Sequence, residues 1–180
     1  MKLNKFKEHY AKFVYERSDV EPVSFLTESL ALKPCLVLMP NKLELIKPAS
    51  EILPDIAAAL TNRSLKILLS SSIDPESHSY IRKFFIIRAE PGDYDTFLLP
   101  KKQFIDKVSY GGVGIVIDLD LRPNLFNAVL ALRSGAKVRT SFDKAVGLPY
   151  YNMIVGPSEP EKNPKASYRV MADVLGNFSF

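Results

Sequence analysis

The chain has 180 residues, of which 47% are hydrophobic and 24% are charged. A chain of this length and composition predicts one domain with a core large enough to need no cross-links. It is not the composition of a disordered tail, a collagen-like chain or a disulfide scaffold. The net charge of +4 is too small to predict nucleic-acid binding without a clustered basic patch, so no nucleic-acid partner is expected.

Cysteine and histidine are scarce, since the chain contains only Cys35, His9 and His78. An internal disulfide is therefore excluded, and a Cys/His zinc site would need about four ligands at defined spacing. Neither histidine stands in the sequence context of a nucleophile elbow. We expect two surface histidines, a buried thiol, no metal and no cofactor.

Residues 1–34 are predicted to form a helical extension, with one helix at residues 2–17 and a second at 23–32. The first helix would be amphipathic with a basic polar face. Such a helix either lies on an anionic membrane surface or packs its aromatic side chains on the domain, and both alternatives stay open. The first ten residues lack the apolar core of a secretory signal, so none is expected, and no apolar run approaches about 18 residues. This predicts a cytoplasmic protein, at the inner membrane surface if the helix binds lipid.

From residue 35 onward, predicted strands and helices alternate. Short apolar runs predict strands at 35–39, 65–69, 84–87, 113–118, 137–141 and 151–155. Helical spacing and capping residues predict helices at 48–60, 74–82, 101–110, 123–133 and 164–175. In this interpretation Pro48 and Pro123 open helices, and Pro54 kinks or restarts one. The alternation predicts βαβ units, and so a mostly parallel sheet covered on both faces.

Ligands of open α/β sheets bind at the carboxyl ends of the strands. No glycine-rich phosphate loop is present there, because Gly111–Gly114 stands before a strand and the loop after Met39 has no glycine. The strongest candidate for a ligand-binding segment contains Asp118, Asp120 and Arg122, since two acids and an arginine meet at a strand end. These acids could accept hydrogen bonds from sugar hydroxyls or from backbone N–H groups, or one of them could cap the following helix.

Three arginines near strand ends suggest an anion site. Arg88, Arg122 and Arg139 could bind an anion in fork geometry. Equally, they could pair with neighbouring acids, namely Asp93, Asp118 and Asp120.

Residues 115–139 resemble the N-terminal domain of glycosyltransferase family 9, the heptosyltransferases of lipopolysaccharide core assembly. The resemblance is carried by Ile117-Asp118-Leu119 at a strand end and by Ser134-Gly135-Ala136 followed by Arg139 and Phe142. The helix at residues 166–176 is similar to the one that closes that domain. The resemblance implies a Rossmann-like three-layer α/β/α domain over residues 35–180, like one half of a GT-B glycosyltransferase.

The chain also departs from that family. The family has a Gly-Asp pair between its first strand and a helix-opening proline, and the aspartate serves as general base. If Pro48 matches that proline, Asn41 and Lys42 occupy the place of the pair, and neither can take up the proton. Glu44 is the nearest carboxylate, and Gly92-Asp93 mimics the pair after a different strand. The chain also stops where the donor-binding C-terminal domain would begin.

Three hypotheses follow. The first is a catalytically inactive, glycosyltransferase-like domain that acts as a binding or interaction module, with a second copy as a partner. The second is the acceptor-binding subunit of a split glycosyltransferase that acts on a cell-envelope glycolipid or polysaccharide, with a separate donor-binding subunit. The third is an independent small enzyme or ligand binder that uses Asp93, Asp118, Asp120 and Arg122. The candidate ligand-binding residues are Asn41, Lys42, Glu44, Arg88, Asp93, Asp118, Asp120, Arg122 and Arg139; no catalytic residue is assigned.

Overall fold

The structure is a computed structural model, and it describes residues 33–60, 63–144, 149–156 and 159–177. The strands are β1 (Cys35–Leu38), β2 (Leu65–Ser70), β3 (Phe85–Ala89), β4 (Ile115–Asp118), β5 (Val138–Phe142) and β6 (Met153–Val155). The α helices are α2 (Leu43–Glu51), α3 (Leu53–Ala59), α4 (Lys102–Ser109), α5 (Leu125–Arg133) and α6 (Pro164–Asn177). Short 3-10 turns are η2 (Pro75–Ser77), η3 (Ile81–Lys83), η4 (Pro91–Asp93) and η5 (Pro160–Lys162). The predicted helices at 2–17 and 23–32, and nearly all of the predicted 1–34 extension, lie outside the described residues.

The strands form one six-stranded sheet in the order β3-β2-β1-β4-β5-β6, and every neighbouring pair is parallel. All six predicted strands are confirmed. The chain builds one half of the sheet outward from β1 to β3, then returns to the centre to build the other half from β4. This is the order of the doubly wound Rossmann fold, and it confirms the predicted fold class.

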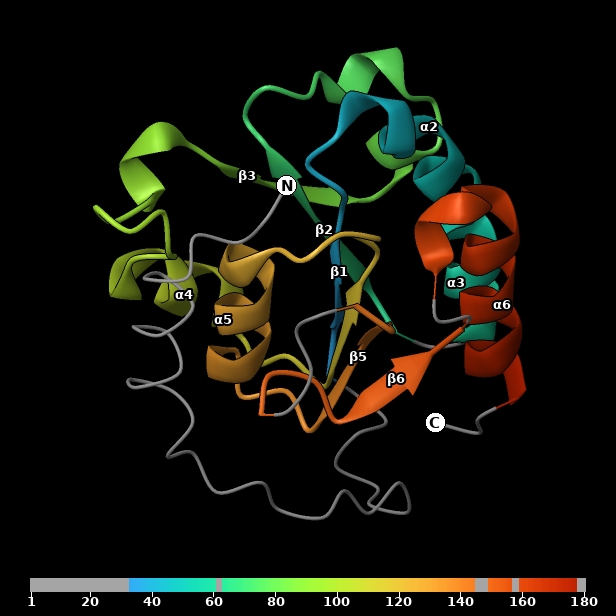
Figure 1. The fold of residues 1–180 in the computed structure, drawn as a ribbon. Coiled ribbons are helices and arrows are strands. Elements are labelled where there is room, and N and C mark those ends of the chain that lie inside the picture. Colours follow the sequence, from blue (N-terminus) through green and yellow to red (C-terminus); the bar gives the residue numbers. More distant parts are fainter. Residues whose placement is uncertain (1–32, 61–62, 145–148, 157–158, 178–180) are drawn as a thin grey trace.

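Helices cover both faces of the sheet (Figure 1). Helices α2, α3 and α6 pack on one face, and α4 and α5 pack on the other. The central strand β1 is buried on both faces, because Cys35 and Val37 belong to one core and Leu36 and Leu38 to the other. A strand covered in this way needs apolar residues at every position, which explains its continuous apolar run.

The prediction that Pro48 opens a helix is wrong, because α2 begins at Leu43 and contains Pro48. The side chains of Leu45 and Ile46 are buried against the sheet, and this burial favours helix well before the proline. The prediction for Pro54 is confirmed, since α3 restarts at Leu53 with this proline in its first turn.

Two other predicted helices differ from the structure, one in where it begins and one in whether it forms. Pro123 precedes α5 instead of opening it, because Asn124 is the N-cap and accepts a hydrogen bond from the backbone N–H of Asn127 at 3.3 Å. The predicted helix at 74–82 is replaced by the two 3-10 turns η2 and η3. Ile81 is the only buried side chain of these two turns, so an apolar stripe that could hold a longer helix on the domain is missing there.

Candidate functional site

The strand order creates a switch point between β1 and β4 at the carboxyl edge of the sheet. The chain leaves β1 toward α2 on one face and leaves β4 toward α5 on the other. The two loops therefore diverge, which is the place where open α/β sheets bind ligands. They touch through the backbone N–H of Asn41, which donates to Oδ2 of Asp120 at 3.4 Å. Three of the predicted site residues, Asn41, Asp118 and Asp120, are thus brought together.

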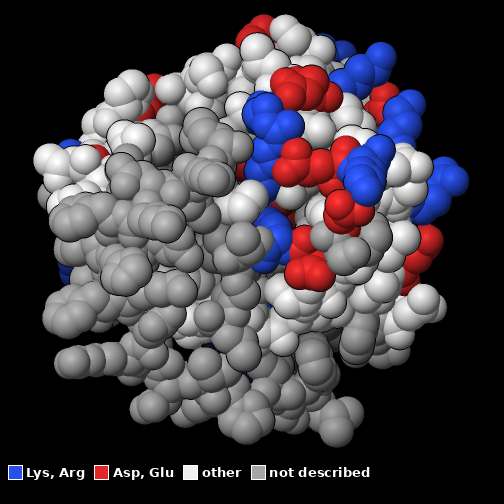
Figure 2. Space-filling view, viewed as in Figure 1, with Lys and Arg blue, Asp and Glu red and all other residues white. Residues whose placement is uncertain are grey.

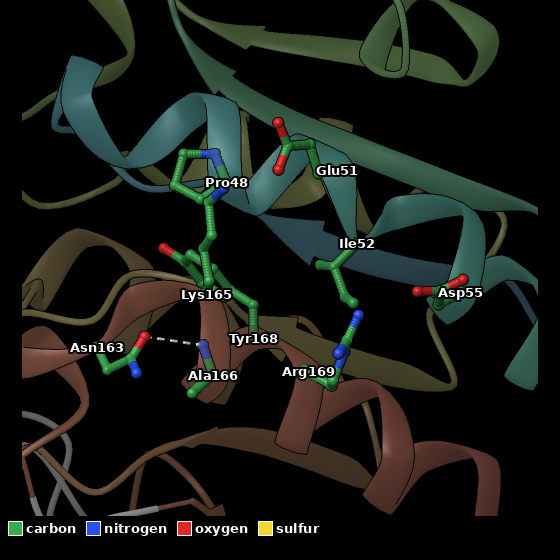
Figure 3. A pocket seen from close by; sticks show the side chains of 9 residues that line it. All are labelled: Pro48, Glu51, Ile52, Asp55, Asn163, Lys165, Ala166, Tyr168 and Arg169. Carbon is green, nitrogen blue, oxygen red and sulfur yellow. Dashed lines mark hydrogen bonds between the residues drawn. The ribbon is translucent and has the colours of Figure 1, made fainter.

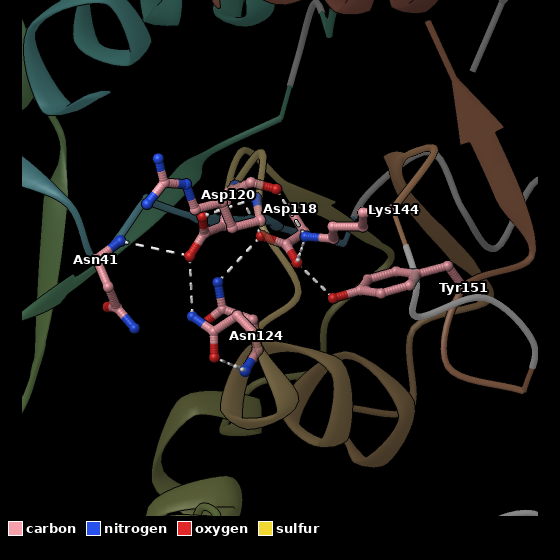
Figure 4. A network of polar contacts seen from close by, with 8 residues as sticks. Asn41, Asp118, Asp120, Asn124, Lys144 and Tyr151 are labelled. Atoms are coloured by element: carbon pink, nitrogen blue, oxygen red, sulfur yellow. Dashed lines mark hydrogen bonds and ion pairs between the residues drawn. The ribbon is translucent and has the colours of Figure 1, made fainter. Parts of the chain in front are cut away.

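The Asp118 carboxylate is the centre of a buried polar network (Figure 4). Its Oδ1 accepts from the backbone N–H of Asp120 at 2.9 Å and from Nδ2 of Asn127 at 3.0 Å. Its Oδ2 accepts from Nζ of Lys144 at 2.6 Å and from the hydroxyl of Tyr151. Both oxygens are therefore fully used, and the network joins the ends of β4 and β5 to the chain before β6.

Lys144 forms a buried ion pair with Asp118. The Lys144 side chain is 2% exposed and that of Asp118 is 0% exposed. The ammonium also donates to the backbone carbonyl of Asp120 at 2.7 Å and lies 5.5 Å from the centroid of the Tyr151 ring. Burial, and then the negative charge of Asp118, raises the pKa of Tyr151 well above its ordinary value. The tyrosine therefore stays protonated and serves as a hydrogen-bond donor.

Asp120 ties down the loop between β4 and α5. Its Oδ1 accepts from the backbone N–H of Arg122 at 3.2 Å, and its Oδ2 accepts from Nδ2 of Asn124 at 3.0 Å. Burial, and then the neighbouring charge of Asp118, raises the pKa of the Asp120 carboxyl. Neither aspartate caps α5, because Asn124 does so. The alternative of a capping role for these aspartates is therefore wrong, and the expectation that they accept hydrogen bonds from backbone N–H groups is confirmed.

The other predicted site residues have local partners or lie elsewhere. Lys42 and Glu44 form an exposed ion pair at 3.4 Å, next to Asn41. Arg122 pairs with Glu161 at 2.5 Å, near the network. The carboxylate of Asp93 accepts the backbone N–H of Glu90 at 2.9 Å and so closes the η4 turn.

Two of the predicted arginines are held by backbone carbonyls. Arg88 donates to the carbonyl of Ser71 at 2.5 Å, beyond the end of β2. Arg139 donates to the carbonyls of Tyr150, Ala136 and Pro149 at 2.8, 3.0 and 3.3 Å. Because Ala136 precedes β5, the guanidinium of Arg139 lies toward the amino end of that strand. The structure does not bring it to the network.

Sequence reasoning missed Lys144, Tyr151 and Asn127. Lys144 comes two residues after β5, so its place at a strand end was a usable signal. Asn127 lies within α5, three residues after the cap. Tyr151 precedes β6 instead of following a strand, and no local pattern indicates that its hydroxyl reaches Asp118.

A cavity of about 300 Å³ adjoins the network, with Leu121, Lys144 and Glu161 among its lining residues. Within the described residues, no group of three or more histidine, cysteine or acidic side chains could hold a metal ion. No helix in the described ranges is long and apolar enough to cross a membrane.

No model of a known protein family matches the chain, and no curated protein matches it either.

Proposed function

We propose that the chain is a glycosyltransferase-like single domain that acts as a binding or interaction module and does not catalyse glycosyl transfer by itself. The observation that carries this proposal is that the hydrogen-bond acceptor positions of the Asp118 carboxylate are all occupied. A general base needs a lone pair that faces its substrate, and both oxygens of this buried carboxylate already accept hydrogen bonds within the chain.

The groups around Asn41 support the same proposal. The resemblance expects a free aspartate on the loop after β1, and this loop carries Asn41 and Lys42 instead. The Lys42 ammonium is paired with Glu44, and the backbone N–H of Asn41 is bound to Asp120. The loop is thus fixed by the network, which favours a preorganised surface over a proton-transferring one.

The relationship to glycosyltransferase family 9 is part of this proposal. It is supported by the residue pattern from Ile115 to Phe142 and by the Rossmann-like strand order. In that pattern, Asp118 is the last residue of β4, and Gly135 follows α5 and its C-cap Ser134 with a φ of +75°. Fold-level analogy alone does not assign a function, so the proposal rests on the site.

A transfer assay and a binding assay test the proposal together. The full chain is incubated with nucleotide sugars and with candidate saccharide acceptors, and released nucleotide is measured. We expect no turnover. Turnover that disappears in Asp120→Asn, while the circular dichroism spectrum stays unchanged, would show a catalyst and overturn the proposal.

The binding arm uses calorimetry with nucleotide sugars and anionic sugars, together with light scattering after size exclusion. We expect heat from one of these ligands or a stable dimer. A clean monomer that binds no sugar, nucleotide or protein would contradict a binding or interaction module.

A second candidate function is the acceptor-binding subunit of a split glycosyltransferase. It is favoured by Leu43, which is 67% exposed at the start of α2 and follows the loop at the switch point. An exposed leucine beside a ligand edge is a suitable contact for a separate donor-binding subunit. Copurification of such a subunit, weakened by Leu43→Asp, supports this candidate. A pull-down that recovers no partner contradicts it.

A further inference from the structure

A second cavity lies on the helical layer (Figure 3). It has a volume of about 500 Å³ and is lined by residues of α2 and α3 on one side and of α6 on the other. An adjoining cavity of about 600 Å³ continues along α3 and α6, and the two share Ile52, Asp55 and Arg169. Ligand sites in proteins occupy about 300–1,000 Å³, so the first cavity alone could hold one sugar ring.

The two walls of this cavity carry opposite charges. Glu51 and Asp55 line it from α2 and α3, and Lys165 and Arg169 line it from α6. Figure 3 shows the Lys165 and Arg169 side chains extending from α6 toward the facing helices. Within the described residues, no ion pair joins either cation to either carboxylate. The charged groups are thus available to a molecule placed between the walls.

The lining also contains apolar side chains and a buried tyrosine. Pro48, Ile52 and Ala166 give apolar surface between the charged groups. Tyr168 lines the cavity and is 1% exposed, and its hydroxyl has no hydrogen-bond partner in the described part of the chain. This hydroxyl is itself buried, and burial, followed by the charges of Asp120 and Asp118, raises the pKa of Tyr168, so Tyr168 lines the cavity without offering its hydroxyl to a ligand.

We propose that this cavity binds a neutral saccharide. A sugar hydroxyl both donates and accepts hydrogen bonds, so it can donate to Glu51 or Asp55 and accept from Lys165 or Arg169. The apolar face of the ring would lie on Pro48 and Ile52. This site does not depend on the function proposed for the strand-end network.

Charge balance favours a neutral sugar over a phosphate or another anion. Two carboxylates offset two cations in the lining, so an anion attracted to Arg169 would also face Asp55. The outer surface agrees with this balance, since acidic and basic side chains alternate on the face seen in Figure 2, over the part occupied by α2 and α6. A strongly basic pocket would instead steer anions.

Nuclear magnetic resonance of the full ¹⁵N-labelled chain tests the proposal. The probes are the methyl glycosides of glucose, galactose, mannose and N-acetylglucosamine, and inorganic phosphate is the anionic comparison. We expect at least one glycoside to shift the amide signals of residues 48–55 and 163–169 without shifting those of 118–124. Because a hydrogen bond to a charged group contributes about 1.5–3 kcal/mol, we expect Arg169→Ala to weaken binding about tenfold or more.

Lys137→Ala is the matched control, because Lys137 is exposed and lies outside the cavity lining. It should leave the affinity unchanged. The proposal is overturned if no glycoside shifts these amides, if phosphate alone does so, or if Arg169→Ala and Lys137→Ala bind the sugar equally well. Failure here would leave the turnover and nucleotide-sugar results on the strand-end network untouched.

Discussion

Replacing Lys144 with methionine removes the cation from the most buried ion pair of the described chain. The side chains of Lys144 and Asp118 are 2% and 0% exposed, and the pair is 2.6 Å apart. Removing one partner of a buried pair leaves an uncompensated charge and destabilises a protein by about 3–5 kcal/mol. Asp118 keeps three other donors, so we expect a loss near the lower end, about 3 kcal/mol at neutral pH.

Urea unfolding followed by far-ultraviolet circular dichroism measures this loss, since the chain has no tryptophan. Domains of this kind have about 5–15 kcal/mol of stability, so the variant should still fold. Lys137→Met on the surface is the control and should stay within about 0.5 kcal/mol of the wild type.

A double-mutant cycle with Asp118→Asn isolates the pair. When Asp118→Asn has already removed the buried negative charge, Lys144→Met should be milder, with a coupling of about 1–3 kcal/mol between the two changes. If Lys144→Met lowers the free energy of unfolding by less than about 1 kcal/mol, or if the two changes simply add, then the ion pair does not hold the strand ends together.

Three further outcomes follow from the same structure. Burial and the charge of Asp118 raise the pKa of Asp120, so the folded chain binds a proton at the Asp120 carboxyl more tightly than the unfolded chain does. This proton binding adds to the free energy of unfolding below the ordinary pKa of 3.8, and the added stability is lost as pH rises through the folded pKa. The wild type should therefore gain stability relative to Asp120→Asn as pH falls from neutral toward 3.8, and a difference that stays constant in urea unfolding would contradict this. Gly135→Ala places a side chain at a φ of +75° and should lower the free energy of unfolding by about 1–2 kcal/mol. Gly92→Ala is the control and should be nearly neutral, because its added Cβ meets no atom within 4 Å. Equal effects of the two substitutions would contradict the argument from backbone strain. Burial raises the pKa of Cys35 to about 12, so a thiol reagent should label the native chain only at its rate of unfolding, and fast labelling in native buffer would be the contrary result.

The predicted strands agree with the structure because their signal is local. A strand buried on both faces, such as β1, needs an unbroken apolar run, and that run is visible in the sequence. Helix starts depend more on tertiary packing. Local rules place a helix boundary at Pro48, but burial of Leu45 and Ile46 favours a helix that begins before this proline.

The candidate site was predictable only in part. Asp118 and Asp120 follow a predicted strand, so strand-end reasoning found them, and Asn41 was found in the same way. Their partners come from distant parts of the chain: Lys144 is 26 residues and Tyr151 is 33 residues away from Asp118. The donor-saturated state of Asp118, which argues against a catalytic role, depends on those distant partners.

The sequence by itself determined the fold class, because alternating apolar runs and helical patterns leave a parallel α/β sheet as the arrangement that buries them. Only the tertiary structure decided what the polar residues do. Strand order placed Asn41 beside Asp120, and packing of the segment before β6 brought the Tyr151 hydroxyl to Asp118. Hydrogen bonds act over about 3 Å, and no local pattern fixes the position of groups far apart along the chain to that precision.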